Sequence, residues 1–370
     1  MSSVSSSHWD IFCQVVDNFG DIGVSWRLAC QLADAHGRTV TLWVDDLTIA
    51  EKIFGAGHPK VQIRHWNAQA DFSKVAPVVV ETFSCGLPER YQQAMSPKTL
   101  WLNVDYLTAE DWVEGFHGRP SPQANGLVRY FIYPGFSMQT GGLLREDFLP
   151  AIQRQAQQSA PEVWRHLGLA PSPNVINISL FCYAHAPIKG LLDSLARSTY
   201  PSRLIVSESV AAAVSQALGL DAIDPGQSIR HFNCEIVVIP FLPQIDYDRL
   251  LALCDVNFVR GEDSWIRAIW AAKPMVWLPY QQSENTHLQK LDAFLNHYLA
   301  LANDEVKAQV KSVMQAWAAG VWSAEDWDAF ISHRDQVKQH SQAFATHLSK
   351  QPDLATNLMV FVEKLRENRV

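Results

Sequence analysis

The sequence lacks paired cysteines, long hydrophobic runs and clusters of basic residues. Its six cysteines are scattered without a C-x-x-C pair, a pattern typical of reduced thiols in a cytosol rather than of a disulfide scaffold. No run of about 18 apolar residues could span a bilayer. The Ser-rich start of the chain has neither the basic nor the apolar region of a signal peptide. We therefore expect a cytoplasmic protein with no membrane partner.

Basic residues are in the minority. Lys and Arg total 30 against 38 Asp and Glu, which gives a formal net charge of −8. Without a dense Lys/Arg run, the chain lacks the electrostatic footprint of a nucleic-acid binder. It also lacks G-x-G-x-x-G after its first apolar run, and it has no G-x-x-x-x-G-K-[ST]. We therefore expect no nucleic acid as a partner, and neither a dinucleotide dehydrogenase nor a P-loop enzyme.

Metal-ligand patterns are weak. Two D-x-D triplets, at residues 246–248 and 326–328, are typical of acidic residues at helix starts. His333, His340 and His347 recur every seventh residue, but histidines two helical turns apart cannot share one ion. A solvated helix face explains the three histidines better. We expect no metal site and no cofactor.

What is present predicts two α/β domains. The 370 residues exceed the size of one hydrophobic core, and 48% of them are hydrophobic. Short β-branched apolar runs alternate with helical patterns, which is typical of parallel sheets built from βα units. The predicted strands are 11–16, 39–44, 61–66, 78–81 and 100–104, followed by 175–181, 203–207, 236–240, 256–259 and 274–278.

The break between the domains is predicted near residue 170, where a Pro-containing segment, 170–173, precedes the second series of strands. The last 70 or so residues look wholly helical. Two such sheets imply a cleft between the domains that faces the carboxyl ends of the strands, where ligands of parallel sheets bind.

The first candidate site is the segment from Asp17 to Gly23, a predicted loop at the carboxyl end of the first strand. Asp17 and Asp21 could project together over a ligand, while Gly20 would let the backbone come close to it. The same acids could instead be helix N-terminal caps, which Asp favours by hydrogen bonding and dipole alone. We favour the functional interpretation because two carboxylates and two glycines share one short segment.

The second candidate site is Arg260-Gly261-Glu262-Asp263-Ser264, again between a predicted strand and a helix. It offers a guanidinium, a flexible glycine and free N–H groups at a helix start, which suits a diphosphate. A carboxylate such as that of Glu262 would be repelled by a diphosphate alone, so its presence indicates a nucleotide sugar. The alternative is a helix cap with a surface Arg–Glu pair worth under about 1 kcal/mol.

A third group of residues could hold a nucleotide base. Pro240-Phe241-Leu242-Pro243-Gln244 is a rigid turn that presents one ring and one amide after a strand. Phe181 and Tyr183 follow another strand of the same domain, and Tyr280 follows its last strand. Each ring could equally belong to the core, and this ambiguity stays open.

Several long motifs resemble those of the EarP family of protein-arginine rhamnosyltransferases, which modify translation elongation factor P. They are the segments 11–29, 240–244 and 259–264, with shorter matches at 81–83, 101–103, 135–137, 141–143, 284–285 and 287–288. The resemblance runs over nearly the whole chain. It implies a GT-B glycosyltransferase fold, in which two Rossmann-like domains face each other across a cleft and the C-terminal helices return to the first domain. The domains would be 1–170 plus about 350–370, and 171–349.

The resemblance also implies roles for residues of the candidate sites. Asp21 would be the general base, Asp17 its essential companion, and Glu262 an essential residue of the donor site. The donor would be dTDP-β-L-rhamnose, used without a metal ion, and the acceptor elongation factor P. The expected substrate-binding residues are Asn18, Phe19, Gly20, Phe181, Tyr183, Phe241, Gln244, Arg260, Gly261, Asp263, Ser264 and Tyr280.

The chemistry of an arginine acceptor agrees with these residue types. A guanidinium is protonated below a pKa of about 12, so it is a poor nucleophile. Two nearby carboxylates could hold it by charge-assisted hydrogen bonds and accept a proton during an inverting displacement. Two alternatives stay open: a GT-B enzyme with another nucleotide sugar or a small-molecule acceptor, and a non-catalytic nucleotide-sugar-binding regulator.

Overall fold

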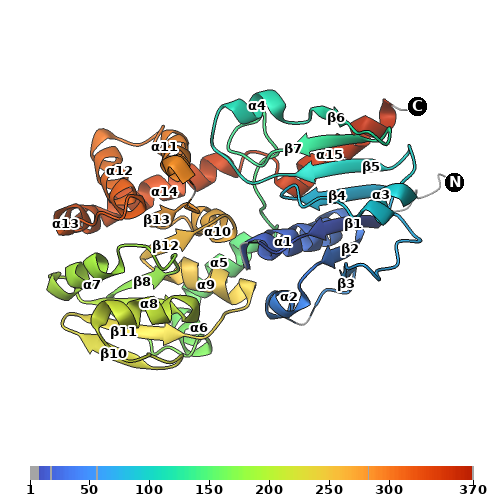
Figure 1. Cartoon of the computed structure of the whole chain (residues 1–370). Helices are drawn as coiled ribbons and strands as arrows, with labels where there is room; N and C mark the ends of the chain where they lie inside the picture. The colour runs from blue at the N-terminus through green and yellow to red at the C-terminus, as the bar shows by residue number, and fades with distance from the viewer. Residues whose placement is uncertain (1–7, 17–18, 56, 282, 369–370) are drawn as a thin grey trace. The chain divides into compact units, whose positions relative to one another are not determined.

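The computed structural model of the chain describes residues 8–16, 19–55, 57–281 and 283–368. The chain divides into two compact units (Figure 1). Unit 1 comprises residues 1–147 and 349–370, and unit 2 comprises residues 148–348. Each unit is built around one sheet.

The sheet of unit 1 is parallel except at one edge. Its strands are β1 (His8–Cys13), β2 (Thr39–Val44), β3 (Val61–His65), β4 (Val78–Thr82), β5 (Leu100–Val104), β6 (Pro120–Pro122) and β7 (Val128–Ile132). They lie in the order β3-β2-β1-β4-β5-β7-β6, and only β6 runs antiparallel to its neighbour. The strand order reverses between β1 and β4, and that is the point where open α/β sheets bind ligands, beyond the carboxyl ends of the strands.

The helices of unit 1 include one from the far end of the chain. They are α1 (Phe19–His36), α2 (Leu47–Phe54), α3 (Glu89–Ala94), α4 (Trp112–Phe116) and α15 (Leu354–Glu367). Helix α15 contacts α1, and its Phe361 ring packs edge-on against Tyr130 of β7 at 5.7 Å. Residues 354–367 are therefore part of the first unit, as expected for the C-terminal end.

The sheet of unit 2 repeats the same plan. Its strands are β8 (Ile176–Leu180), β9 (Ser202–Ser207), β10 (Ser228–His231), β11 (Cys234–Ile239), β12 (Val256–Arg260) and β13 (Met275–Leu278). They lie in the order β10-β11-β9-β8-β12-β13, with β10 antiparallel to β11. Here the reversal falls between β8 and β12, so the residues that follow these two strands occupy the ligand-binding edge.

Unit 2 also holds the helical segment that follows its sheet. Its helices are α5 (Leu149–Gln158), α6 (Ala160–His166), α7 (Ile188–Arg197), α8 (Glu208–Leu218), α9 (Gln244–Leu253), α10 (Asp263–Ala271), η1 (Ser283–Asn285), α11 (Thr286–Tyr298), α12 (Asp304–Ala318), α13 (Ala324–Ser332) and α14 (Arg334–Leu348). From residue 286 onward the described chain forms only helices and their connections, as the sequence predicts.

The boundary between the units lies at residues 147 and 148, earlier than the predicted break near residue 170. The reason is that α5 and α6 pack on other elements of unit 2, α5 by contact with α9. Trp164, Leu167 and Leu169 share one buried cluster with residues of β9, β11 and α9. The Pro-containing segment 170–173 is therefore a connection within unit 2.

Three local expectations differ from the structure. The first strand spans residues 8–13 instead of 11–16, and the hairpin of β6 and β7 lies in a stretch without a predicted strand. The predicted solvated face of three histidines is wrong for His340, which is 7% exposed and donates from Nε2 to the Tyr298 carbonyl at 2.8 Å. The prediction that acids of the two D-x-D triplets lie at helix starts is confirmed for Asp246 and Asp326, which lie in the first turns of α9 and α13.

Candidate functional site

Asp21 lies in the first turn of α1, directly after β1, and is 2% exposed. Its Oδ2 accepts a hydrogen bond from the Val16 backbone N–H at 2.9 Å. A carboxylate in the first turn of a helix is stabilised by the helix dipole. The carboxylate is therefore fixed against the backbone that enters the helix.

A chain of hydroxyl groups joins this helix to the two central strands. Ser25 Oγ donates to the Asp21 carbonyl at 2.8 Å and lies 3.0 Å from Thr82 Oγ1. Thr82, the last residue of β4, donates in turn to the Phe12 carbonyl of β1 at 3.0 Å. Since all of these groups are buried, the first turn of α1 is held rigidly at the point where the strand order reverses.

A second carboxylate at this edge was not among the sequence candidates. Asp45 follows β2, and its Oδ1 accepts from the Val15 backbone N–H at 2.8 Å. Its position directly after a buried strand is the signal that could have identified it. Asp45 also lines a hollow of about 400 Å³ at the same edge, together with Gln14, Trp66, Asn67, Ala68, Phe72, Pro88, Glu89 and Arg90.

The predicted loop from Asp17 to Gly23 is wrong for its second part, because α1 already begins at Phe19. Phe19 and Gly20 are half-buried residues of its first turn. The carboxylate of Asp21 and its place in the dipole favour helix here, and the glycines do not prevent it. Asp17 and Asn18 lie outside the described residues.

In unit 2 the predicted site residues Arg260, Phe181 and Tyr183 come together at the corresponding edge. The guanidinium carbon of Arg260 lies 4.5 Å from the Phe181 ring centroid and 4.6 Å from that of Tyr183. Phe181 and Tyr183 follow β8, while Arg260 ends β12, and the strand order reverses between these two strands. The two rings hold a planar cation at the ligand-binding edge by cation–π attraction.

The turn from Gly261 to Ser264 is built on backbone contacts. Ser264 Oγ accepts from the Arg260 N–H at 3.0 Å and donates back to the Arg260 carbonyl. Gly261 adopts a left-handed φ of +57°, which favours glycine, and its carbonyl accepts from Trp277 Nε1 at 2.8 Å. Glu262 is the N-cap residue of α10, and Asp263 lies in its first turn.

The remaining predicted rings and amides lie at the same edge of the sheet. Tyr280 is 56% exposed and packs edge-on against Tyr183 at 5.7 Å, while Phe181 contacts Tyr247 at 6.0 Å. Gln244 is the first residue of α9. The Phe241 backbone N–H donates to Glu208 Oε2 at 3.1 Å, a partner that the sequence did not indicate.

Buried ionisable groups beside both sites are held in their neutral forms. Burial raises the pKa of the Cys13 thiol in β1 to about 12, and it raises the pKa of the Cys182 thiol beside Arg260 to about 12. Burial, with a smaller effect of His287, lowers the pKa of His185, whose ring stacks on Tyr183 at 5.6 Å. Neither thiol is a nucleophile at neutral pH.

A buried ion pair fixes the two helices that begin at the site of unit 2. Arg267 of α10 donates from Nε and Nη2 to the two carboxylate oxygens of Asp248 in α9, each at 2.8 Å. Both side chains are 1% exposed. Asp248, the second acid of one D-x-D triplet, is thus a structural partner of Arg267. Helices α9 and α10 are held in one orientation by this fork.

The described part of the chain contains neither a cluster of potential metal ligands nor a helix that could span a membrane. No group of three or more His, Cys, Asp or Glu side chains within residues 8–16, 19–55, 57–281 and 283–368 is arranged to hold a metal ion. Over the same ranges, no helix is long and apolar enough to cross a membrane.

Comparisons with known proteins point to one family. The profile of the family described as "Elongation-Factor P (EF-P) rhamnosyltransferase EarP" matches residues 9–363. A protein-arginine rhamnosyltransferase of Pseudomonas putida is 44% identical, and the match covers 95% of this chain and 98% of the relative. A relative of the same description from Pseudomonas aeruginosa is 40% identical, with the same shares covered.

A solved structure extends this similarity to the fold. It is described as "Structural basis for EarP-mediated arginine glycosylation of translation elongation factor EF-P". It matches with a TM-score of 0.72 and 34% identity, over 96% of this chain and 99% of that chain.

Proposed function

The chain belongs to the EarP family of elongation-factor P rhamnosyltransferases, and we propose that it transfers L-rhamnose from dTDP-β-L-rhamnose to an arginine side chain of translation elongation factor P. Its two sheets are the Rossmann-like domains of a GT-B glycosyltransferase. The anomeric C–O bond to the diphosphate breaks, a C–N bond to the guanidinium forms with inversion, and dTDP leaves.

The observation that carries the donor half of the proposal is the Arg260 cation between two rings at the sheet reversal of unit 2. Arg260 lies over Phe181 and Tyr183, and the N-terminus of α10 follows within three residues. A helix N-terminus and a guanidinium together stabilise a diphosphate, whose negative charge grows as the glycosidic bond breaks. This cation can take the place of a metal ion, because it compensates the negative charge of the departing diphosphate.

Glu262 gives the donor site selectivity for a sugar. It is the N-cap residue of α10, next to the proposed diphosphate position, where a bare carboxylate would repel phosphate oxygens. A rhamnose hydroxyl that donates to this carboxylate removes that penalty. We propose that Glu262 accepts from the sugar, which distinguishes a nucleotide sugar from a free nucleotide.

The acceptor half of the proposal rests on Asp21. Its carboxylate is buried and held by the Val16 N–H at the start of α1. We propose that Asp21, with Asp17 as its companion, binds the acceptor guanidinium and accepts its proton as the nitrogen attacks. A fixed carboxylate loses little conformational entropy when it binds the guanidinium, which favours proton transfer in the transition state.

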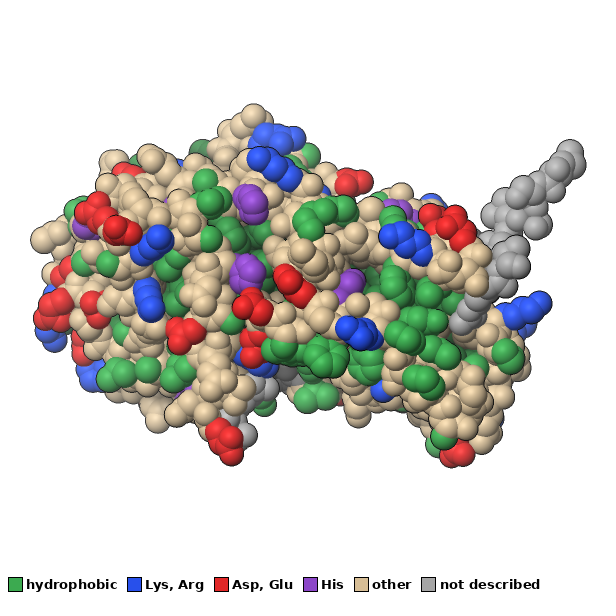
Figure 2. Space-filling view, turned by 90° about the horizontal axis from the view of Figure 1, so that it is seen from above, with side chains coloured by type: hydrophobic (Ala, Val, Ile, Leu, Met, Phe, Trp, Pro, Cys, Tyr) green, Lys and Arg blue, Asp and Glu red, His purple; other side chains and the backbone are tan. Residues whose placement is uncertain are grey.

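A protein acceptor also needs a docking surface, and unit 1 exposes aromatic side chains that suit one. Figure 2 shows hydrophobic side chains gathered on one face of this unit, in the right-hand part of the view. Tyr106 is 43% exposed and stacks on Phe83 at 4.4 Å. Trp112 and Phe116 of α4 are 48% and 57% exposed. Exposed aromatic residues of this kind are enriched at protein interfaces.

The proposal is tested by incubating the protein with elongation factor P and dTDP-β-L-rhamnose and analysing the product by mass spectrometry. We expect a mass increase of one deoxyhexosyl residue on a single arginine. Elongation factor P in which that arginine is replaced by lysine is the matched control and should stay unmodified. Transfer to a small-molecule acceptor alone, or from another nucleotide sugar alone, would contradict the proposal.

A further inference from the structure

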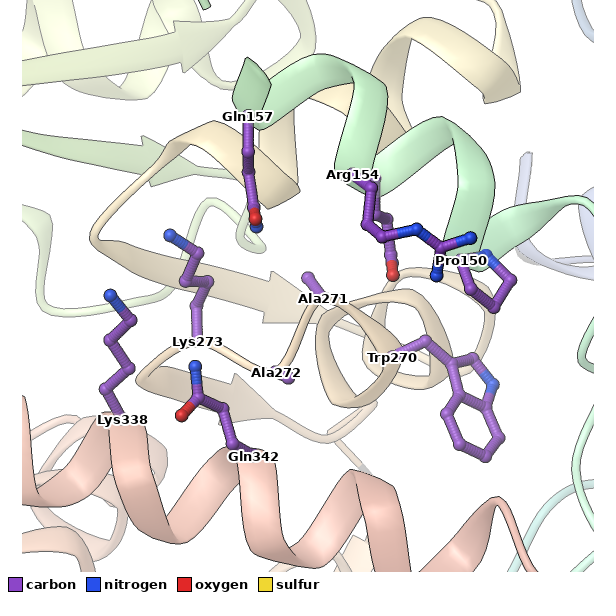
Figure 3. A pocket seen from close by; sticks show the side chains of 10 residues that line it. Pro150, Arg154, Gln157, Trp270, Ala271, Ala272, Lys273, Lys338 and Gln342 are labelled. Atoms are coloured by element: carbon purple, nitrogen blue, oxygen red, sulfur yellow. The ribbon is translucent and has the colours of Figure 1, made fainter.

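Unit 2 contains a cavity of about 280 Å³ that the proposed transfer reaction does not use (Figure 3). Its walls come from α5 and α14, and its floor comes from the end of α10 and the approach to β13. The residues that line it are Pro150, Gln153, Arg154, Gln157, Trp270, Ala271, Ala272, Lys273, Lys338 and Gln342. A space of this size suits a small ligand.

The cavity is strongly cationic. Three of its lining residues, Arg154, Lys273 and Lys338, are basic, and none is acidic. No carboxylate within the described ranges forms an ion pair with any of the three. Burial, and then the positive charge of Lys338, lower the pKa of Lys273, although the negative charge of Asp255 opposes this. The cavity therefore gathers three cations, none of which has an ion-pair partner among the described residues.

Stabilisation of a helix end explains only part of this arrangement. Lys273 follows the C-terminus of α10, where a cation interacts favourably with the helix dipole. One cation would serve that purpose. Lys338 and Arg154 come from α14 and α5, and three carboxamides, Gln153, Gln157 and Gln342, complete the lining. A second cation beside Lys273 is unfavourable unless an anion lies between them.

We propose that this cavity binds a small molecule that carries two phosphate groups. Figure 3 shows Lys273 and Lys338 at one end with Gln342 and Gln157, and Arg154 at the other end with Trp270. One phosphate would accept charge-assisted hydrogen bonds from the two lysines, and the second from the fork of Arg154. Gln342 and Gln157 supply neutral donors at the lysine end, where Gln157 Nε2 also donates to the Ala252 carbonyl at 3.5 Å.

The cavity is distinct from the proposed donor site. Arg260 lies at the carboxyl end of β12 and pairs with Leu278 of β13, whereas Lys273 precedes the amino end of β13. The five residue-to-residue steps from 273 to 278 span roughly 16 Å at the rise of a β-strand. The two sites therefore lie at opposite edges of the sheet, and a ligand in the cavity leaves the donor site accessible. The inference stands independently of the proposed function.

The test is a calorimetric titration of the full chain with inorganic diphosphate at fixed ionic strength, carried out in parallel on Arg260→Met, which removes the cation of the proposed donor site and leaves the cavity residues unchanged. We expect diphosphate to bind to both proteins, and to bind at least about tenfold more tightly than inorganic phosphate, because the second phosphate adds charge-assisted hydrogen bonds. Lys338→Met and Lys273→Met should each weaken diphosphate binding by about tenfold. The side chain of Lys338 is exposed, so its removal should leave the fold intact.

Lys311→Met is the matched control, since Lys311 is an exposed lysine of α12 outside the cavity and its loss changes the net charge equally. It should leave the dissociation constant unchanged. The inference is overturned if diphosphate does not bind at millimolar concentration, or if Lys338→Met has no effect. It is also overturned if Lys311→Met weakens binding as much as Lys338→Met, because attraction by net charge would then suffice.

Discussion

The guanidinium carbon of Arg260 lies 4.5 Å from the centroid of the Phe181 ring. Arg260 ends β12 and Phe181 directly follows β8, two strands that are remote in sequence and adjacent in the sheet. The contact orients a planar cation, so its fork of N–H groups stays available for a ligand. In the proposed reaction this orientation determines how well the departing diphosphate is stabilised.

Replacing Arg260 by lysine should weaken dTDP binding by about tenfold or more. A lysine keeps the charge, but it loses the planar fork and the stacking on two rings, each cation–π contact being worth roughly 0.5–2 kcal/mol. Isothermal titration with dTDP measures the change. Arg334→Lys is the matched control, because Arg334 also lies over a ring, that of Tyr200 at 5.3 Å, on another part of unit 2. Equal affinities of the wild type and Arg260→Lys would contradict the donor assignment.

Replacing Asp21 by asparagine should abolish transfer while leaving dTDP binding unchanged. The amide has the shape of the carboxylate and still accepts from the Val16 N–H, but it cannot take a proton, and loss of general-base catalysis lowers kcat by roughly 10²–10⁴-fold. Transfer to elongation factor P and dTDP affinity are measured side by side.

Asp45→Asn is the control for Asp21→Asn. Asp45 accepts a hydrogen bond from the neighbouring Val15 N–H at 2.8 Å, as Asp21 does from Val16, but it has no proposed role in proton transfer. Asp45→Asn should retain most of the activity. A loss as large as that of Asp21→Asn would show that both acids serve only to shape the segment after β1.

Removing Arg267 should destabilise unit 2 strongly. Arg267→Met leaves the Asp248 carboxylate buried without the guanidinium that binds it in bidentate fashion. Breaking a buried ion pair in this way lowers the unfolding free energy by about 3–5 kcal/mol. Arg165→Met is the control, since its pair with Glu162 is more than 60% exposed on both sides and is worth no more than about 1 kcal/mol. Urea unfolding of both variants gives the comparison. A similar loss for the two variants would contradict the role of the buried fork.

The cysteine thiols next to the two sites should be unreactive in the folded protein. Burial raises the pKa of Cys13 and of Cys182 to about 12, so near pH 8 roughly one thiol in 10⁴ is ionised. Iodoacetamide labelling followed by mass spectrometry should leave both residues unmodified at pH 8, whereas both should react in guanidinium chloride. Rapid modification of either residue in the folded state would mean that its strand end opens to solvent.

The local pattern of apolar residues in the sequence was sufficient to predict the buried parallel strands, because each strand has its own continuous apolar run. It failed where a partner remote in sequence decides the structure. The first strand ends at Cys13 because the N–H groups of Val15 and Val16 donate to the carboxylates of Asp45 and Asp21 and not to a neighbouring strand. Strand β7 was missed because it is half-buried and its cover, Phe361, comes from the far end of the chain.

The same limit applies to the candidate sites. The sequence motifs identified Arg260, Phe181 and Tyr183 as candidate site residues. Only the structure shows that the two rings lie against the guanidinium. Asp45 and Glu208 were missed because a single acid after a strand or at a helix start has an ordinary structural explanation. The roles of Asp21 and Glu262 stay predictions, since they depend on substrates.

The docking of α15 on unit 1 depends on Gly142. This residue has a φ of +73°, and a Cβ atom there would lie 2.6 Å from the Pro352 carbonyl oxygen, just before α15. Placing an L-residue in the left-handed region lowers the unfolding free energy by roughly 1–2 kcal/mol, and Gly142→Ala should lower it by more than that. Gly126→Ala isolates that conformational cost, because Gly126 has a φ of +81° with open space around its Cβ position. Unfolding free energies from urea titration should differ by at least about 1 kcal/mol between the two variants, since the carbonyl of Pro352 must move and strain the contacts of α15. Equal losses would mean that α15 can shift without penalty, and that the close approach of the two segments does not hold the C-terminal helix in place.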